Sequence, residues 1–415
     1  MDTFASLHPV PAAWLRDSAL APHISAYWHR LVQRGYADHT ARMYLYSVAH
    51  FARWMRLRRI ATSNLTEGAV RQFIAEHLPH CTCPMPARRC VHVVRAALRH
   101  LLVTLDEGGV LLKAESPTAV DDELRRFDEY MDRARGLARG TRVQRLKVVR
   151  AFLQQTRGPR PRVLTCPTAD ELRGFIDRQL QRWCPASAKI LAGTLRSYLR
   201  YRATLGDPVG RLLPVIASPA NWRLAALPQT PSRQEVRQLL DAFPRGLPSR
   251  HRAYAMVRCL VDLGLRASEV VGLDLDDIDW AAGTLRIVKN KSRRVDVLPL
   301  PQTTGHAIAT YLRAERPPTA SRRVFVRHVA PVDEPIGPEV VRKTVRDAYR
   351  RSGLPYTRVH ILRHALASRL LATGGTLKEV ADVLRHRALD TSLIYAKVDM
   401  ARLSAVAMPW PGGAP

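Results

Sequence analysis

The sequence has 415 residues, of which 65 are Lys or Arg and 36 are Asp or Glu, so its formal net charge at pH 7 is +29. This excess argues against an ordinary metabolic enzyme and favours a polyanionic partner, for which nucleic acid is the first candidate. We expect a reduced, cytoplasmic chain with no membrane span, because it has only six cysteines, no apolar run of about 18 residues and no signal-peptide pattern.

The first two thirds of the sequence have the periodicity of helices, as in residues 40–55, where apolar side chains recur at helical spacing. The segment 34–37, Arg-Gly-Tyr-Ala, recurs 101 residues later as Arg-Gly-Leu-Ala. Two further segments recur in the same order, so that Leu-Thr at 65–66 matches Leu-Thr at 164–165, and Phe73 matches Phe175. The sequence therefore predicts two similar helical modules, at residues 1–115 and 118–226.

Three cysteines of the first module, Cys81, Cys83 and Cys90, lie close together in the sequence, and His80 and His92 flank them. Thiolate and imidazole groups at this density can hold zinc, although Cys-x-Cys is a tighter spacing than the usual finger pattern. The three cysteines are therefore a zinc candidate, with loop cysteines in an arginine-rich turn as the alternative, and we expect no other metal site.

A new domain is predicted after the proline-rich stretch 214–231, which has the composition of a linker. Ser232 and Glu235 have the spacing of a capping box, which marks the start of a helix. Two stretches, 284–288 and 295–298, have the composition of strands and flank a polar turn. Helical periodicity returns after residue 337, so residues 230–415 are predicted to form an α+β domain that is mostly helical.

Four segments of this third domain carry side chains suited to phosphodiester exchange without a metal ion. They are residues 264–269, 289–294, 360–364 and 384–395. The reaction needs a nucleophile, cationic donors for the phosphate oxygens, an acid for the leaving 5′ oxygen and a base. Tyr395 can be the nucleophile, and Arg266 and Arg363 can clamp the phosphate. Lys291 can deliver the acid proton, and His360 can act as base or relay.

These segments resemble the catalytic domain of the tyrosine recombinase (phage integrase) family, whose pattern is Arg, Lys, His-x-x-Arg, His or Trp, and Tyr. The matching residues are Arg266, Lys291, His360, Arg363, His386 and Tyr395. The 26 residues between the two histidines and the nine from the second histidine to the tyrosine are intervals that the family uses. We put the chance of this spacing arising by accident at roughly one in several hundred.

Some assignments within this pattern stay open. The family usually has Gly-Lys-Gly at the hairpin tip, whereas this chain has Lys-Asn-Lys-Ser at 289–292, so Lys289 is the alternative to Lys291. We expect Glu269 to hold the fold rather than to do chemistry, and His364 and Arg385 to be structural or to face DNA.

The resemblance implies a mainly α, multidomain protein: two SAM-like helical core-binding modules and an α+β catalytic domain with a small antiparallel sheet, at residues 230–415. It implies a site-specific recombinase or integrase that cleaves and rejoins double-stranded DNA through a 3′-phosphotyrosyl intermediate, with no cofactor. The duplicated module favours the integrase or transposase of a mobile element. The alternatives are a topoisomerase-like or hairpin-forming strand transferase with the same chemistry, and a DNA-binding relative that does not catalyse.

The resemblance also implies partners. They are a homotetramer at synapsis, a monomer or dimer away from DNA, and an accessory recombinase or DNA-bending protein, all at the bacterial nucleoid. In the family such a tail often docks on a neighbouring protomer, so for residues 397–413 we weigh this docking equally against a frayed terminus rich in Pro and Gly.

Overall fold

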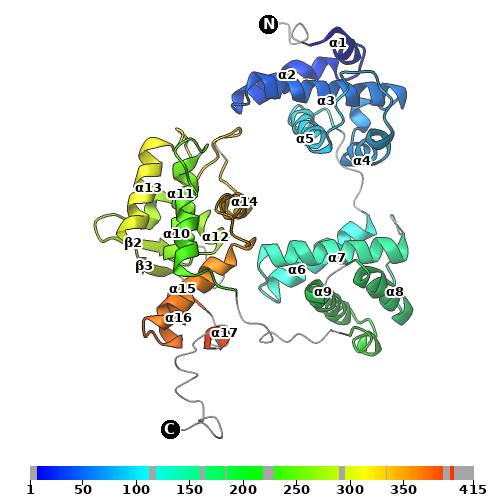
Figure 1. The fold of residues 1–415 in the computed structure, drawn as a ribbon. Helices are drawn as coiled ribbons and strands as arrows, with labels where there is room; N and C mark the ends of the chain where they lie inside the picture. Colours follow the sequence, from blue (N-terminus) through cyan, green and yellow to red (C-terminus); the bar gives the residue numbers. More distant parts are fainter. Residues whose placement is uncertain are drawn as a thin grey trace, which may run out of the picture. The chain divides into compact units, whose positions relative to one another are not determined.

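The computed structural model describes residues 7–111, 118–158, 164–182, 185–217, 229–288, 295–332, 334–386 and 393–396 (Figure 1). The chain divides into two compact units, residues 1–110 together with 224–415, and residues 111–223. The expectation of three domains, at 1–115, 118–226 and 230–415, stays a prediction. Among the described helices, none combines the length and apolarity that crossing a membrane requires.

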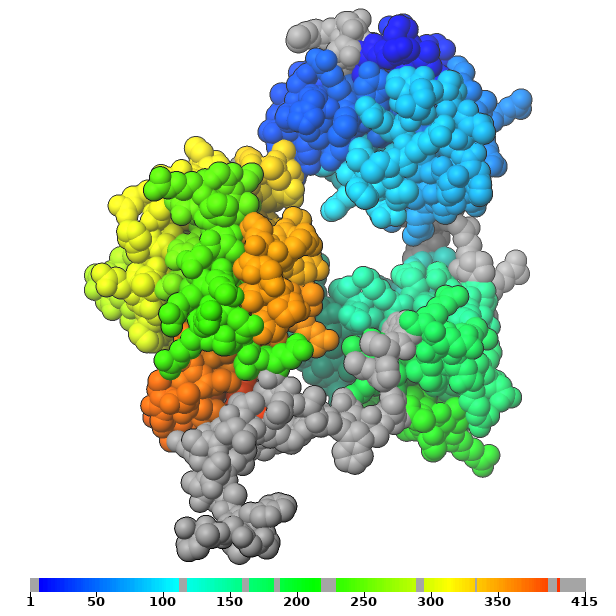
Figure 2. Space-filling view, viewed as in Figure 1, coloured from blue at the N-terminus to red at the C-terminus, as the bar shows by residue number. Residues whose placement is uncertain are grey.

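The N-terminal residues form five α-helices that pack on one another (Figure 1). These are α1 (Pro9–Arg16), α2 (Ile24–Gln33), α3 (Asp38–Leu57), α4 (Glu67–Gln72) and α5 (Val91–Glu107). Helix α3 confirms the helix expected over 40–55 and packs against α1 and α5. Its Phe51 and Trp54 rings stack at a centroid distance of 5.5 Å, and Phe73 contacts both. The space-filling view shows this blue and cyan body as closely packed (Figure 2).

The second unit is a bundle of four α-helices. They are α6 (Ala119–Arg133), α7 (Arg139–Arg157), α8 (Ala169–Leu180) and α9 (Pro185–Thr204). Phe127, Phe152 and Phe175 are buried in its core. Glu123 of α6 and Arg202 of α9 form a buried ion pair at 2.9 Å, which ties the first helix of the bundle to the last.

The two helical bodies share the local structure that the sequence repeat predicts. Gly35 follows α2 with φ +74° and Gly136 follows α6 with φ +57°, a conformation that favours glycine. Extended Ala37 and Ala138 then begin α3 and α7. The matched segments 34–37 and 135–138 therefore make the same helix–turn–helix corner.

The match of residues 164–165 to residues 65–66 does not correspond to equivalent positions in the structure. Thr66 caps α4, whereas the cap of α8 is Thr168 and not Thr165. The buried Phe73 and Phe175 each follow the capping threonine by seven residues, so the structural repeat keeps the spacing from cap to core.

The C-terminal residues form eight described α-helices around their own core. These are α10 (Arg233–Asp241), α11 (Arg250–Asp262), α12 (Ala267–Val270), α13 (Gln302–Ala314), α14 (Pro338–Arg351), α15 (His360–Ala372), α16 (Leu377–Val383) and α17 (Leu393–Ala396). The capping box at Ser232 and Glu235 is confirmed at the start of α10. The Tyr356 hydroxyl also donates to Glu235 at 2.9 Å, which links this helix start to the chain before α15.

A three-stranded antiparallel sheet has the order β1 (Ile278–Asp279), β2 (Thr284–Ile287) and β3 (Asp296–Pro299). Leu285 pairs with Leu298 and both are buried, so β2 and β3 confirm the two expected strands. The sequence did not predict β1, which has only two residues. The turn 289–294, with Lys289 and Lys291, and the tail 397–413 lie outside the described residues.

Candidate active site

The loop between α11 and α12 depends on Gly264. Its φ is +57°, and a Cβ added there would lie 2.8 Å from a methyl carbon of Leu366 and 2.9 Å from one of Leu384. Its carbonyl oxygen accepts a hydrogen bond from the buried guanidinium of Arg363. A glycine is therefore needed at this position for two reasons, its backbone conformation and the close approach of neighbouring side chains.

The buried carboxylate of Glu269 joins two arginines, and its side chain is 1% exposed. It accepts from the backbone N–H of Arg266 at 2.8 Å and from the Arg266 guanidinium at 2.6 Å. The Arg385 guanidinium donates to it as well, also at 2.8 Å. Burial acts to raise the pKa of Glu269, but Arg385 and Arg266 outweigh burial and the net pKa is lowered. Glu269 is thus an ionised anchor, which agrees with the fold-holding role expected for it.

Arg363 is buried and has hydrogen-bond donors to spare. It is 2% exposed, and within the part of the chain that the structure describes its Nε and Nη2 atoms have no hydrogen-bond partner. Burial, followed by the nearby charges of Arg266 and Arg385, lowers the pKa of Arg363 to about 9. Because a guanidinium stays protonated in proteins, these two donors define a place where an anion would be strongly favoured.

Tyr395 lies beside Arg363 and is 1% exposed. Its hydroxyl is 2.9 Å from Nδ1 of His364 on α15. Burial raises the pKa of Tyr395, whereas Arg363 and Arg266 act to lower it. The sequence reasoning did not assign His364 to the chemistry, although it directly follows Arg363 and lies one helical turn after His360.

His360 and His386, the two histidines of the sequence pattern, are neutral at pH 7. Burial, reinforced by His364, lowers the pKa of His360 to about 4, and burial together with Arg363 does the same for His386. The His360 and His364 rings meet edge to face at a centroid distance of 4.8 Å. The His386 ring lies nearly parallel to that of Tyr395, at 6.3 Å.

The structure thus brings together five of the six residues that the sequence pattern singled out. They are Arg266, His360, Arg363, His386 and Tyr395, and each is linked to another by the contacts or charge interactions given above. The sixth, Lys291, and its alternative Lys289 lie outside the described residues. Arg385, expected to be structural or to face DNA, holds Glu269 from inside the core, which agrees with the structural alternative.

A surface hollow of about 430 Å³ adjoins this group, and Arg266 and His360 form part of its wall. Three further arginines line it, Arg342, Arg346 and Arg358. The first turn of α15 borders it as well, and exposed N–H groups at a helix N-terminus favour anions. The hollow is thus positively charged on several sides.

Comparison with known proteins agrees with this arrangement. The sequence profile of the Phage integrase family matches residues 231–402. A relative from Sinorhizobium fredii, "Putative integrase/recombinase y4rA", is 36% identical over 404 residues, which are 96% of each chain. The chain belongs to the phage integrase family. This is the family of tyrosine recombinases, enzymes that break and rejoin DNA at specific sites.

Other members of the family match over shorter stretches. "Tyrosine recombinase XerC" of Azotobacter vinelandii is 34% identical over 245 residues, which are 57% of this chain and 78% of the relative. Among solved structures, XerH site-specific recombinase bound to palindromic difH substrate aligns at a TM-score of 0.52 and 16% identity, over 72% of this chain and 98% of that chain. A lambda integrase dimer bound to a core site aligns at 0.51 and 16% identity, over 66% and 94%. These likenesses confirm the mainly helical recombinase fold with a small antiparallel sheet.

The Gly264→Ala substitution should destabilise this recombinase locally. The added methyl group forces strain at positive φ and overlap with Leu366 and Leu384, which together cost about 2–5 kcal/mol. Hydrogen exchange of the α15 amides in the full chain measures this loss.

Gly283→Ala is the matched control for this substitution. Gly283 has a φ of +61° and nothing within 4 Å of an added Cβ. It should therefore show only the backbone strain, about 1–2 kcal/mol, and only in its own turn. Equal losses in the two variants would contradict the packing argument at Gly264.

Proposed function

We propose that this recombinase cleaves DNA with Tyr395 as nucleophile, needs no metal ion at the reacting phosphate, and integrates or transposes a mobile element. The observation that carries the proposal is the buried Arg363 guanidinium, with two donors unmatched among the described residues, next to a buried tyrosine. A phosphodiester fits this place because it is an anion with two non-bridging oxygens.

Charge balance supports a phosphate at this position. Arg266, Arg363 and Arg385 lie around one carboxylate, that of Glu269, so the group carries an excess of positive charge. A phosphodiester anion offsets part of this excess, and arginine can engage two phosphate oxygens at once. Charge that builds on those oxygens in the transition state is then stabilised without a metal ion.

The reaction can be followed atom by atom. The Tyr395 oxygen bonds to phosphorus, and the bond from phosphorus to the 5′ oxygen breaks, which leaves a 3′-phosphotyrosyl link and a 5′ hydroxyl. The Tyr395 proton passes to His364 Nδ1, the imidazole nitrogen 2.9 Å away, with His360 as relay. The 5′ hydroxyl of a second DNA strand reverses these steps, so no cofactor is consumed. His386 lies along the Tyr395 ring and holds it in place.

We assign the acid for the leaving 5′ oxygen to Lys291. Strands β2 and β3 pair with each other, and Lys291 lies between them in the sequence. The register of the following Arg-Arg-Val-Asp favours Lys291 over Lys289.

Exposed basic side chains make the DNA contacts beyond the reacting phosphate. In the second unit Arg133, Arg135, Arg139 and Lys147 are exposed on α6, α7 and the turn between them. Three further arginines of α7 bond to protein side chains: Arg142 pairs with Asp128 at 3.1 Å, Arg145 donates to Ser197 and Arg150 pairs with Asp121. We infer that the two helical modules, 1–115 and 118–226, grip the duplex while residues 230–415 carry out the chemistry. The exposed residues set the salt dependence of binding.

The names of relatives support the wider assignment. An integrase/recombinase from Sinorhizobium fredii matches nearly the whole chain. The Tn1549 transposon integrase in complex with circular intermediate DNA aligns at a TM-score of 0.50 and 16% identity, over 69% of this chain and 100% of that chain. The lambda integrase structure is a dimer bound to a core site. We infer that this chain likewise assembles on DNA, as a tetramer when two sites are joined.

Tyr395→Phe should abolish covalent linkage to DNA while leaving DNA binding intact. The assay uses a nicked duplex that carries a candidate end of the element and releases a short 5′ fragment, so that the linkage is trapped. The wild-type chain should give an adduct that survives SDS.

Tyr356→Phe is the control, because it removes a hydroxyl bonded to Glu235 outside the site. An adduct in Tyr395→Phe would overturn the assignment. Binding without an adduct in the wild type would favour the non-catalytic alternative, and relaxation of supercoiled plasmid without sites would favour the topoisomerase-like one.

Lys291→Ala should slow cleavage about 10²–10⁴-fold on ordinary DNA, because the 5′ oxygen then leaves without its proton. A substrate with sulfur in place of the bridging 5′ oxygen needs no acid, so it should restore the rate of this variant. Lys289→Ala is the matched control and should cleave both substrates at the wild-type rate. Rescue of Lys289→Ala in place of Lys291→Ala would reverse the assignment of the lysine.

His364→Gln should slow adduct formation about 10²–10⁴-fold at pH 7, because an amide can hold the Tyr395 hydroxyl but cannot take its proton. The residual rate should rise with pH, since attack then depends on tyrosine that has already ionised. Adduct yield against pH measures both effects, with the exposed His306→Gln as control. A wild-type pH profile in His364→Gln, together with loss in His360→Gln, would make His360 the base.

A further inference from the structure

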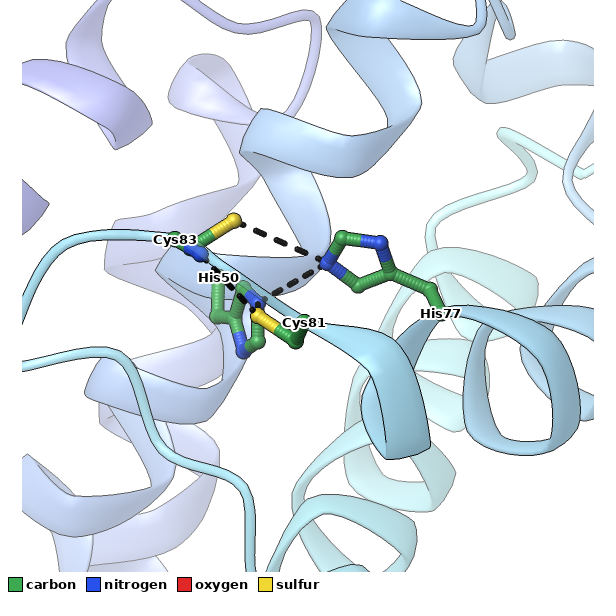
Figure 3. A group of neighbouring side chains, drawn as sticks. All are labelled: His50, His77, Cys81 and Cys83. Carbon is green, nitrogen blue, oxygen red and sulfur yellow. Dashed lines mark hydrogen bonds between the residues drawn. The ribbon is translucent and has the colours of Figure 1, made fainter.

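A group of four side chains among the N-terminal helices lies outside the recombinase chemistry. His50 belongs to α3, and His77 ends the π-helix η3 (Phe73–His77). Cys81 and Cys83 follow the 3₁₀-helix η4 (Leu78–His80). The four side chains point toward one another (Figure 3), and their ligand atoms all lie within 4.8 Å of one another.

The distances within the group are those of a tetrahedral metal site. His50 Nε2 lies 3.1 Å from His77 Nε2 and 3.2 Å from Cys81 Sγ, and Cys83 Sγ lies 3.7 Å from His77 Nε2. Bond lengths of about 2.3 Å to sulfur and about 2.0–2.1 Å to nitrogen separate the ligands of tetrahedral zinc by about 3.3–3.8 Å. These three pairs lie within a few tenths of an ångström of tetrahedral zinc geometry, and no pair of ligand atoms in the group is more than 4.8 Å apart.

The orientation of His50 supports a metal ligand. Its Nδ1 lies 2.9 Å from the carbonyl oxygen of Arg88, to which it donates. This bond fixes the tautomer and leaves the lone pair of Nε2 directed at the group, as the second partner of a ligating histidine does.

Hydrogen bonds alone explain the group poorly. The single lone pair of His50 Nε2 faces both the His77 nitrogen and the Cys81 sulfur, at 3.1 and 3.2 Å. One lone pair makes one good hydrogen bond, so the other close approach would be unfavourable. A cation at the centre satisfies both approaches, because every atom of the group then donates its electrons to the metal.

The local backbone conformation directs the His77 side chain toward the other three side chains of the group. Helix α4 gives way to the π-helix Phe73–His77, and such wide turns are rare and occur frequently at functional sites. Phe73 packs edge to face against His50 at 5.2 Å and stacks on His77 at the same distance. The aromatic core thus holds both imidazoles in place before any ion binds.

We propose that His50, His77, Cys81 and Cys83 bind one Zn²⁺ ion. Two sulfurs and two nitrogens in a tetrahedral arrangement suit zinc, and the two thiols release their protons to solvent as the ion binds. With four protein ligands no coordination position stays open, so the ion is structural and not catalytic. The ion would link residues 81–83 to α3 and to the end of η3, ahead of the start of α5.

This ligand set corrects the one expected from the sequence. Cys81 and Cys83 keep their place, but Cys90 is exposed and is not one of the group. His80 and His92, which flank the cysteines in the sequence, are exposed as well. The two histidines that complete the set are His50 on α3, 31 residues before Cys81, and His77 at the end of η3, four residues before Cys81.

The test measures metal in the full chain and does not depend on recombination. Protein purified in zinc-supplemented buffer without chelator should hold about one zinc per chain by elemental analysis. After exchange with Co²⁺ it should show the strong visible bands of tetrahedral cobalt together with thiolate-to-cobalt charge transfer. Cys83→Ser should lose both signals, whereas Cys90→Ser and His92→Gln should keep them.

X-ray absorption at the zinc edge of the wild-type chain keeps the proposal testable if Cys83→Ser fails to fold. The expected result is two sulfur and two nitrogen neighbours, at about 2.3 and 2.0–2.1 Å. A wild-type chain without zinc or a cobalt spectrum would overturn the proposal. So would loss of metal in Cys90→Ser or an oxygen-rich coordination shell.

Discussion

One buried carboxylate allows the positive charges of the active site to lie together. Glu269 accepts hydrogen bonds from Arg266 and Arg385, which lie near the buried Arg363. In a medium of low dielectric constant three close guanidinium groups would repel one another strongly. The same carboxylate bonds the backbone N–H that begins α12, so it sets the course of the chain as well as the charge balance. The proposed phosphate site, the start of α12 and the position of Arg385 all depend on the Glu269 carboxylate.

Much of the candidate site could be predicted because its chemistry is tied to spacing along the chain. His360 and Arg363 share one helical turn, and Tyr395 follows His386 at a fixed interval, so these residues can be found without a structure. The contact of His364 with the tyrosine could not be found in this way. It depends on how the short helix α17 packs against α15, and sequence spacing does not determine that packing.

The fold likewise has local features that the sequence predicts and long-range features that it does not. The capping box at Ser232 and the helix over 40–55 were predictable because both are local, decided within one or two turns. The repeat was found, yet the sequence match pairs Thr66 with Thr165, whereas the structurally equivalent capping residue is Thr168. A match by residue type can be displaced by a few positions where the loops differ in length. The proposed zinc ligands show most clearly what the sequence alone could not predict. His50 is an ordinary helical residue in the sequence, and only the packing of α3 against the following turns gives it cysteine neighbours.

The two Arg363 donors that have no partner among the described residues bear on the stability of the protein when it is not bound to DNA. A ligand that binds only the folded state stabilises that state by mass action. If DNA binds beside Arg363 as proposed, it would act as a folding ligand as well as a substrate, and the protein would be more stable bound than free. Subunits away from DNA would then open more often, and cellular proteases act on such openings. The amount of intact recombinase would thereby be coupled to the number of DNA sites that it can occupy.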